Sequence, residues 1–246
     1  MLKALSVRAQ QGRQFIPDPR SGRPEGLRGL PVLTAGECAS CRACMAACPT
    51  SAIAVDPLQI DLARCVFCNE CVVVCPDDRV RFTPEPSMAS TRASGLLVRA
   101  GSSVEPIVPD EVFRRHFGRS LRLRQVSAGG CNACELELNA AANVNFDMQR
   151  YGIDWVASPR HADALVLTGP LTQQMAAAVR LGWDAMPEPR FLVAVGACAI
   201  SGGLYADGDA IDRSFLSEVG PALFVPGCPP HPLTFLRGLL DFLGIA

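Results

Sequence analysis

Twelve cysteines are the residues of this 246-residue chain whose types and spacing could do chemistry. Eight of them fall into two runs that both follow the pattern C-x2-C-x2-C-x3-C-P. The first run has Cys38, Cys41, Cys44 and Cys48, and the second has Cys65, Cys68, Cys71 and Cys75. A tight loop of this kind lets three thiolates converge on one iron–sulfur cubane, while the fourth reaches a second cubane.

The two runs therefore predict two 4Fe-4S clusters that exchange their fourth ligands. We expect cluster 1 at Cys38, Cys41, Cys44 and Cys75, and cluster 2 at Cys48, Cys65, Cys68 and Cys71. The alternatives are disulfides or a four-cysteine zinc module, although zinc sites rarely draw all their thiolates from so dense a run. A zinc-stabilised interaction scaffold is the competing hypothesis from another functional class.

The other four cysteines lie in three segments that are far apart in the sequence, and each segment has small residues such as Gly130, Gly196 and Gly227. Small residues allow backbone amides to approach the sulfurs of a cluster. Buried free cysteines are the alternative interpretation, because cysteine is often a small core residue. A third 4Fe-4S cluster is expected at Cys131, Cys134, Cys198 and Cys228.

Short apolar runs separated by helical lengths begin near residue 119 and predict a parallel sheet with crossover helices. The expected strands are 121–126, 155–157, 164–168, 191–195 and 222–225. The expected helices are 134–150, 172–183 and 232–243. The carboxyl ends of such strands form the ligand crevice. The third set of cysteines follows the first, fourth and fifth strands, so these cysteines should meet there.

Residues 20–85 resemble bacterial-type two-cluster ferredoxins. Arg23-Pro24-Glu25 and the segment 62–68 extend the likeness to the ferredoxin-like subunits of formate hydrogenlyase and complex I. Such subunits pass single electrons and carry no substrate site.

From about Phe117 to its end, the chain resembles the small subunit of energy-converting NiFe hydrogenases, the class that includes formate hydrogenlyase. The segments 158–163 and 168–170 share in the likeness. The related complex I subunit has two adjacent cysteines at the first position, whereas Cys131 and Cys134 have the hydrogenase spacing. The resemblance implies a flavodoxin-like domain that holds the cluster nearest nickel. Nickel itself would lie in a separate large subunit, since no second pair of C-x2-C motifs remains for it.

The expected fold is an α+β ferredoxin-like two-cluster domain followed by an α/β flavodoxin-like parallel-sheet domain. The expected boundaries are an N-terminal extension at 1–30, the dicluster domain at 31–85, a connector at 86–116 and the hydrogenase small-subunit-like 4Fe-4S domain at 117–246. The connector is inferred from a stretch rich in Pro, Ser, Ala and Gly.

The resemblance implies an electron-transfer subunit of a membrane-associated NiFe hydrogenase complex. Its implied partners are the large subunit, other subunits of a membrane-bound complex, and an electron donor or acceptor subunit. Ferredoxin and small subunit are normally separate chains, and joining them keeps their clusters at high effective concentration. The alternative is an electron-transfer subunit of a complex I-like or hydrogenase-related oxidoreductase that lacks nickel.

The composition excludes other functional classes. A net charge of −1 and 6% aromatic residues do not suit a nucleic-acid binder. We expect neither a transmembrane segment nor a signal peptide, because no apolar stretch approaches membrane-spanning length and residues 1–30 lack an apolar core. We therefore expect a cytoplasmic protein, held at the inner face of the cytoplasmic membrane by its partners.

Three further residues have alternative interpretations. The resemblance makes Glu135 a candidate proton relay, although a carboxylate in the first turn of a helix is also favoured by the helix dipole. His161 could contact the large subunit, and His231 could bond a cluster sulfur. Structural roles are favoured for both histidines, with His231 near the start of the last helix.

Overall fold

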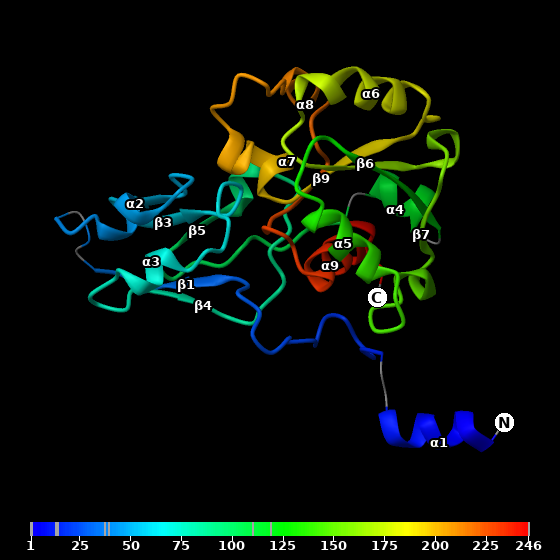
Figure 1. The fold of residues 1–246 in the computed structure, drawn as a ribbon, viewed down its shortest axis with the longest axis horizontal. Coiled ribbons are helices and arrows are strands. Elements are labelled where there is room, and N and C mark those ends of the chain that lie inside the picture. The colour runs from blue at the N-terminus through cyan, green and yellow to red at the C-terminus, as the bar shows by residue number, and fades with distance from the viewer. Residues whose placement is uncertain are drawn as a thin grey trace.

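The N-terminal unit, residues 31–99, is built on two small antiparallel sheets (Figure 1). The computed structural model describes residues 2–12, 15–36, 38, 40–109, 111–118 and 120–245. One sheet pairs β1 (Pro31–Leu33) with β4 (Val80–Phe82), and the other has the order β2-β3-β5. The remaining elements are β2 (Ile53–Val55), β3 (Leu58–Asp61), β5 (Leu97–Arg99), α2 (Ala43–Ala47) and α3 (Glu70–Val73).

Residues 86–116, expected as a connector, contribute structure to both units. Strand β5 pairs with β3 and completes the second sheet of the N-terminal unit. It follows the 3-10 helix η1 (Ala93–Leu96). Ser90 exchanges two backbone hydrogen bonds with Phe224 at the edge of the C-terminal sheet. Helix α4 (Glu111–Phe117) packs its Phe117 into the C-terminal core.

The C-terminal unit, residues 121–245, has a five-stranded sheet in the order β10-β9-β8-β6-β7. All its neighbouring strands are parallel, which confirms the predicted parallel sheet. Counted within the sheet, this order is 2-1-3-4-5, one of the two common orders of doubly wound sheets. The strands are β6 (Leu121–Ser127), β7 (Ile153–Trp155), β8 (Ala164–Thr168), β9 (Phe191–Val195) and β10 (Leu223–Val225).

Helices cover both faces of this sheet. On one face, α5 (Ala133–Ala141) and α9 (Pro232–Leu243) share a core with strand residues such as Leu123 and Val193. On the other face, α6 (Gln173–Asp184) and α8 (Ser214–Val219) pack on Leu165 and Leu192. Continuous burial of β8 and β9 explains their uninterrupted apolar sequences.

Two predicted elements differ from the structure by more than one residue. The helix expected at 134–150 ends at Ala141. Beyond it, the Asn143 side chain accepts a hydrogen bond from the backbone N–H of Asn145, a turn that competes with helix. The 3-10 helix η2 (Met148–Tyr151) follows. The second strand ends at Trp155, two residues earlier than expected, and the chain soon enters the 3-10 helix η3 (Pro159–His161).

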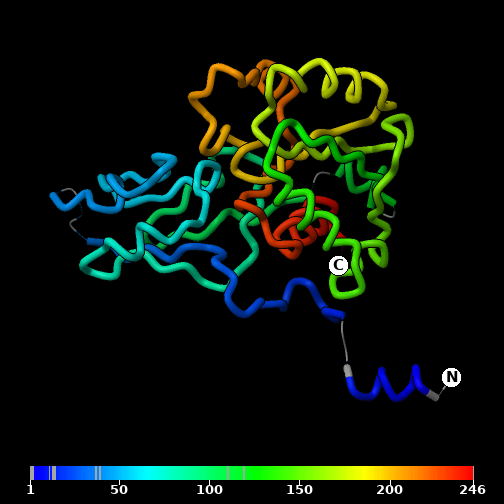
Figure 2. Tube along the Cα trace, viewed as in Figure 1, coloured from blue at the N-terminus to red at the C-terminus, as the bar shows by residue number. Residues whose placement is uncertain are grey.

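A strap, residues 15–30, runs along the C-terminal unit and enters the N-terminal unit at β1 (Figure 2). The side chain of Arg237 in α9, only 2% exposed, fastens it. Its Nη2 donates to the Gly22 carbonyl at 2.6 Å, its Nε donates to the Pro19 carbonyl, and its Nη1 lies 2.7 Å from Glu85 Oε1. One buried guanidinium thus joins the strap, the segment that follows β4 and the last helix.

Helix α1 (Leu2–Gln11) precedes the strap and stands apart from both units (Figure 1). Within the described ranges, no helix combines the length and apolar character needed to cross a bilayer.

Candidate iron–sulfur centres

The same local backbone turn occurs in each of the three expected ligand sets, where it positions a pair of cysteines. Directly after Cys41, Cys68 and Cys131, a residue adopts a positive φ and a helix begins. The three residues are Arg42 at 51°, Asn69 at 77° and Asn132 at 69°. The second cysteine of each pair therefore lies in the first turn of α2, α3 or α5. Asparagine tolerates this left-handed conformation, a sequence signal that the motif analysis did not use.

The structure gathers the N-terminal cysteines into two pockets. The first cysteine group, at one pocket, is Cys38, Cys41, Cys44 and Cys75. The second cysteine group, at the other, is Cys48, Cys65, Cys68 and Cys71. The fourth cysteine of each run thus lies with the first three of the other run, as the exchanged pattern requires.

Backbone amides donate to the sulfurs of both groups. The Ala52 amide lies 3.2 Å from Cys48 Sγ, and the Arg79 amide lies 3.3 Å from Cys75 Sγ. Each donor comes four residues after its cysteine, so the two runs repeat this contact. Such hydrogen bonds stabilise negative charge on sulfur and help to set the potential of a bound cluster.

The third cysteine group lies at the carboxyl edge of the parallel sheet. Its members follow β6, β9 and β10, and Cys198 is in α7 (Ala197–Ser201). The Ala197 amide donates to the Gly227 carbonyl at 2.9 Å, which ties the loops after β9 and β10 together. The group, Cys131, Cys134, Cys198 and Cys228, includes the exposed Cys131 and Cys228.

Close packing at this edge requires glycine at position 196. Gly196 has a φ of 88°, and a Cβ placed there would lie 2.7 Å from Cys134 Sγ. A side chain at this position would displace the thiol. Gly196 therefore keeps space for the sulfur that is expected to bind a cluster.

Burial raises the pKa of several thiols in the second and third groups. The pKa of Cys65 and of Cys134 rises to about 12, and that of Cys71 and of Cys198 to about 11. Burial contributes most to each shift, and the charges of neighbouring cysteines add to it. Metal ligation requires thiolates. The positive charge of bound iron would therefore offset the cost of gathering several thiolates in a partly buried site.

The donor sets fit iron–sulfur clusters. Each N-terminal pocket is lined by four thiols, and thiolates are the usual ligands of 4Fe-4S clusters. Among the residues that the structure describes, no three His, Cys, Asp or Glu side chains gather as a site for a single metal ion.

Glu135 follows Cys134 of the third group in α5, and it is buried. Its Oε1 accepts a hydrogen bond from Thr168 Oγ1 at 2.6 Å. Burial alone would raise the pKa of this carboxyl group, but hydrogen bonds from Ser127 and Thr168 outweigh it and lower the pKa. The carboxylate form is therefore favoured near neutral pH.

The two histidines have different surroundings. His161 is exposed at the end of η3, before β8, and so lies at the sheet edge opposite the cysteines. His231 is the N-cap of α9, where its Nδ1 accepts a hydrogen bond from the Leu233 amide at 3.1 Å. Burial, with a smaller effect of Arg237, lowers the pKa of His231. His231 thus has the structural role expected from its position.

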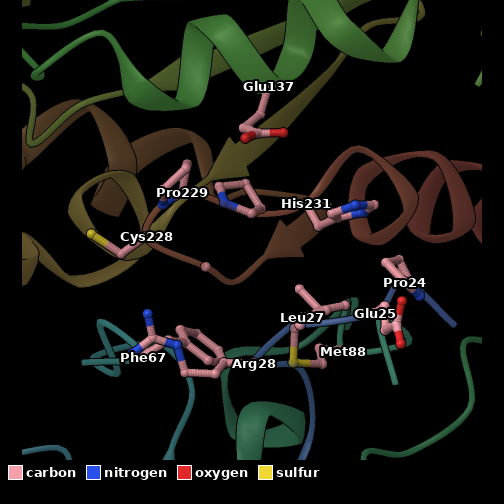
Figure 3. A pocket seen from close by; sticks show the side chains of 13 residues that line it. Pro24, Glu25, Leu27, Arg28, Phe67, Met88, Glu137, Cys228, Pro229 and His231 are labelled. Carbon is pink, nitrogen blue, oxygen red and sulfur yellow. The ribbon is translucent and has the colours of Figure 1, made fainter. Parts of the chain in front are cut away.

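A cleft of about 360 Å³ separates the second group from the third (Figure 3). Arg28 and Phe67 line it from one side, and Cys228 and His231 line it from the other. Arg28 Nη1 donates to the carbonyl of Cys68 at 3.2 Å, which holds the strap against the second group. The cleft is therefore bordered by the loop of the second group, through Phe67, and by the loop that carries Cys228 of the third group.

Comparison with known families matches two parts of the chain. Residues 131–242 match the family described as NADH ubiquinone oxidoreductase, 20 Kd subunit, and residues 37–79 match the 4Fe-4S dicluster domain. The fold and its cysteines thus define an iron–sulfur electron-transfer subunit of the oxidoreductase class. The chain belongs to the family of the NADH ubiquinone oxidoreductase 20 Kd subunit.

Relatives come from hydrogenases and from quinone oxidoreductases. A probable membrane-bound hydrogenase subunit of Pyrococcus furiosus is 36% identical over 126 residues, 51% of this chain and 75% of the relative. Formate hydrogenlyase subunit 7 of Escherichia coli is 39% identical over 127 residues, 52% and 50% of the two chains. A subunit of the NADH-quinone oxidoreductase of Desulfovibrio desulfuricans is 40% identical over 111 residues, 45% and 60%.

Proposed function

We propose that this chain is the electron-transfer subunit of a membrane-associated NiFe hydrogenase complex. It would carry electrons through three 4Fe-4S clusters between a redox donor and the NiFe site of a separate large subunit, where protons and hydrogen interconvert. The observation that carries the proposal is the cleft that is lined both by Cys228 of the third group and by Phe67, the neighbour of Cys68 in the second group. Relatives named as hydrogenase and formate hydrogenlyase subunits support it.

In this proposal each cysteine group holds one cluster. When bound, a 4Fe-4S cluster accepts and releases single electrons. The cysteines of this chain fix the positions of the electron carriers, and its amides and burial set their potentials. Residues 31–85 would be the ferredoxin-like domain and 117–246 the flavodoxin-like domain, with the extension 1–30 and the connector 86–116 beside them.

The large subunit is proposed to cover the rim of the third group. Cys131 and Cys228 are exposed there, and α5 also exposes Leu136, which is 62% exposed. Glu135, the residue after Cys134, is proposed as a proton relay. Other subunits of the complex, including an electron donor or acceptor subunit, would hold the chain at the inner face of the cytoplasmic membrane.

A nickel-free, complex I-like complex is the second candidate. The likeness to a subunit of NADH-quinone oxidoreductase favours it. The separation of Cys131 and Cys134 by two residues favours the hydrogenase.

Isotope exchange and donor-linked hydrogen evolution, measured on the purified complex, test the proposal. Exchange at nickel needs no external electrons, so Cys41→Ala should abolish donor-linked evolution and leave exchange in the assembled complex. Cys134→Ala should damage the large-subunit interface as well, because ligation and local folding are coupled. Equal loss of both activities in both assembled variants would contradict this division of roles. Absence of exchange in the parent complex would favour the nickel-free candidate.

A further inference from the structure

Arg213 precedes α8, and its side chain reaches back to the helix that carries Cys198. Its Nη2 donates to the carbonyls of Ala199 at 3.0 Å and Ile200 at 2.7 Å. Its Nη1 lies 3.2 Å from the Cys198 carbonyl and 3.4 Å from the Pro170 carbonyl. Three of these carbonyls belong to α7, and one of them, that of Cys198, also accepts a hydrogen bond from the Gly202 amide at 2.9 Å. The guanidinium is thus fixed beside a member of the third cysteine group.

No carboxylate of the described residues forms an ion pair with this guanidinium. By contrast, Arg79, at the first cysteine group, lies 3.0 Å from Asp77. Arg213 is half-buried, and its nearest contact with the third cysteine group is the Cys198 carbonyl, 3.2 Å from Nη1. An arginine bound to neutral carbonyls keeps its full positive charge.

We infer that Arg213 is a positioning residue that places an unpaired positive charge beside the third cysteine group and so makes the cluster held there easier to reduce. The inference rests on the proposed function, because it requires a cluster at this group. Reduction adds one electron and no proton, so negative charge increases where the guanidinium lies. A nearby cation stabilises that added charge, and partial burial limits its screening by water.

The test is a redox titration of the anaerobically purified full chain, followed by electron paramagnetic resonance. Arg213→Gln keeps amide donors for the carbonyls of α7 but removes the charge. We expect its third cluster to be about tenfold harder to reduce, a shift of about 59 mV for a one-electron couple. Arg213→Lys keeps the charge and should stay within about twofold of the parent. The two clusters of the N-terminal unit serve as internal references.

A matched control removes a charge elsewhere in the same unit. Arg160 is exposed in η3, at the opposite edge of the sheet, so Arg160→Gln should leave all three potentials unchanged. A loaded third cluster with parent potential in Arg213→Gln would overturn the inference, as would equal shifts in the Gln and Lys variants. If Arg213→Gln binds no third cluster, Arg213→Lys decides alone, and a tenfold shift in it would overturn the inference.

Failure of the inference is distinguishable from failure of the proposed function. Iron and sulfide analysis of the same samples reports whether the third cluster is present. Its absence from the parent chain would overturn both. Its presence with an unmoved potential in Arg213→Gln would overturn the role of Arg213 alone.

Discussion

The double variant Cys48→Ala/Cys68→Ala should lose no more iron than either single variant, about four of the roughly twelve Fe expected per chain. The reason is that Cys48 lies in one pocket with Cys68, although the two belong to different sequence runs. Removal of either thiol should destroy the same cluster, so the second substitution has nothing further to remove.

The matched double variant is Cys48→Ala/Cys41→Ala. These two cysteines belong to the same sequence run but lie in different pockets. Their losses should therefore add to about eight Fe. Iron and acid-labile sulfide would be measured on anaerobically purified chains. If the pair from one run loses about four Fe and the pair from one pocket about eight, the exchange of fourth ligands is wrong.

Arg237→Met should strongly destabilise the chain. The substitution leaves the carbonyls of Pro19 and Gly22 without their donor and deprives Glu85 of its buried partner. Glu85 keeps its ion pair with Arg23, so the main cost is that of two carbonyls left without a charged donor, about 1–3 kcal/mol each. Because urea dependence is about 1–3 kcal/mol per M, the unfolding midpoint should fall by about 1 M or more.

The ionisation of Glu85 supports this expectation. Burial raises the pKa of Glu85, but hydrogen bonds from Ser87 and the charges of Arg23 and Arg237 outweigh it and lower the pKa. The carboxylate is therefore charged, and its pair with Arg237 is fully formed, at neutral pH.

Anaerobic urea unfolding followed by circular dichroism measures the effect of Arg237→Met. Arg92→Met is the control, because Arg92 pairs with Glu105 where both side chains are more than 60% exposed. Such surface pairs contribute little to stability. Equal midpoints for the two variants would show that Arg237 does not fasten the strap.

The sequence was most informative where chemistry dictates spacing. The two C-x2-C-x2-C-x3-C-P runs predicted which cysteines meet, and the structure brings those sets together. The buried strands β8 and β9 were predicted at their observed residues, because a strand buried on both faces is a continuous apolar run. The position of Cys198 after β9 then followed from the chain order.

Long-range packing could be predicted less well from the sequence. Strand β5 is only three residues long, and its pairing with β3 depends on tertiary contacts. The helix beyond Ala141 was overextended, because local bonding by Asn143 outweighs helical periodicity there. Arg213 and Arg237 carried no motif, since their roles depend on contacts with carbonyls of other elements, 13 positions away for Ile200 and 215 for Gly22.

Iron and acid-labile sulfide content, measured together with electron paramagnetic resonance on the anaerobically purified full chain, tests the three-cluster electron path most directly. Twelve cysteines in three groups of four predict about twelve Fe and twelve sulfides per chain, with signals from three 4Fe-4S clusters. A reproducible value near eight Fe, in a chain whose C-terminal unit is folded, would contradict the third cluster and with it the path to a large subunit.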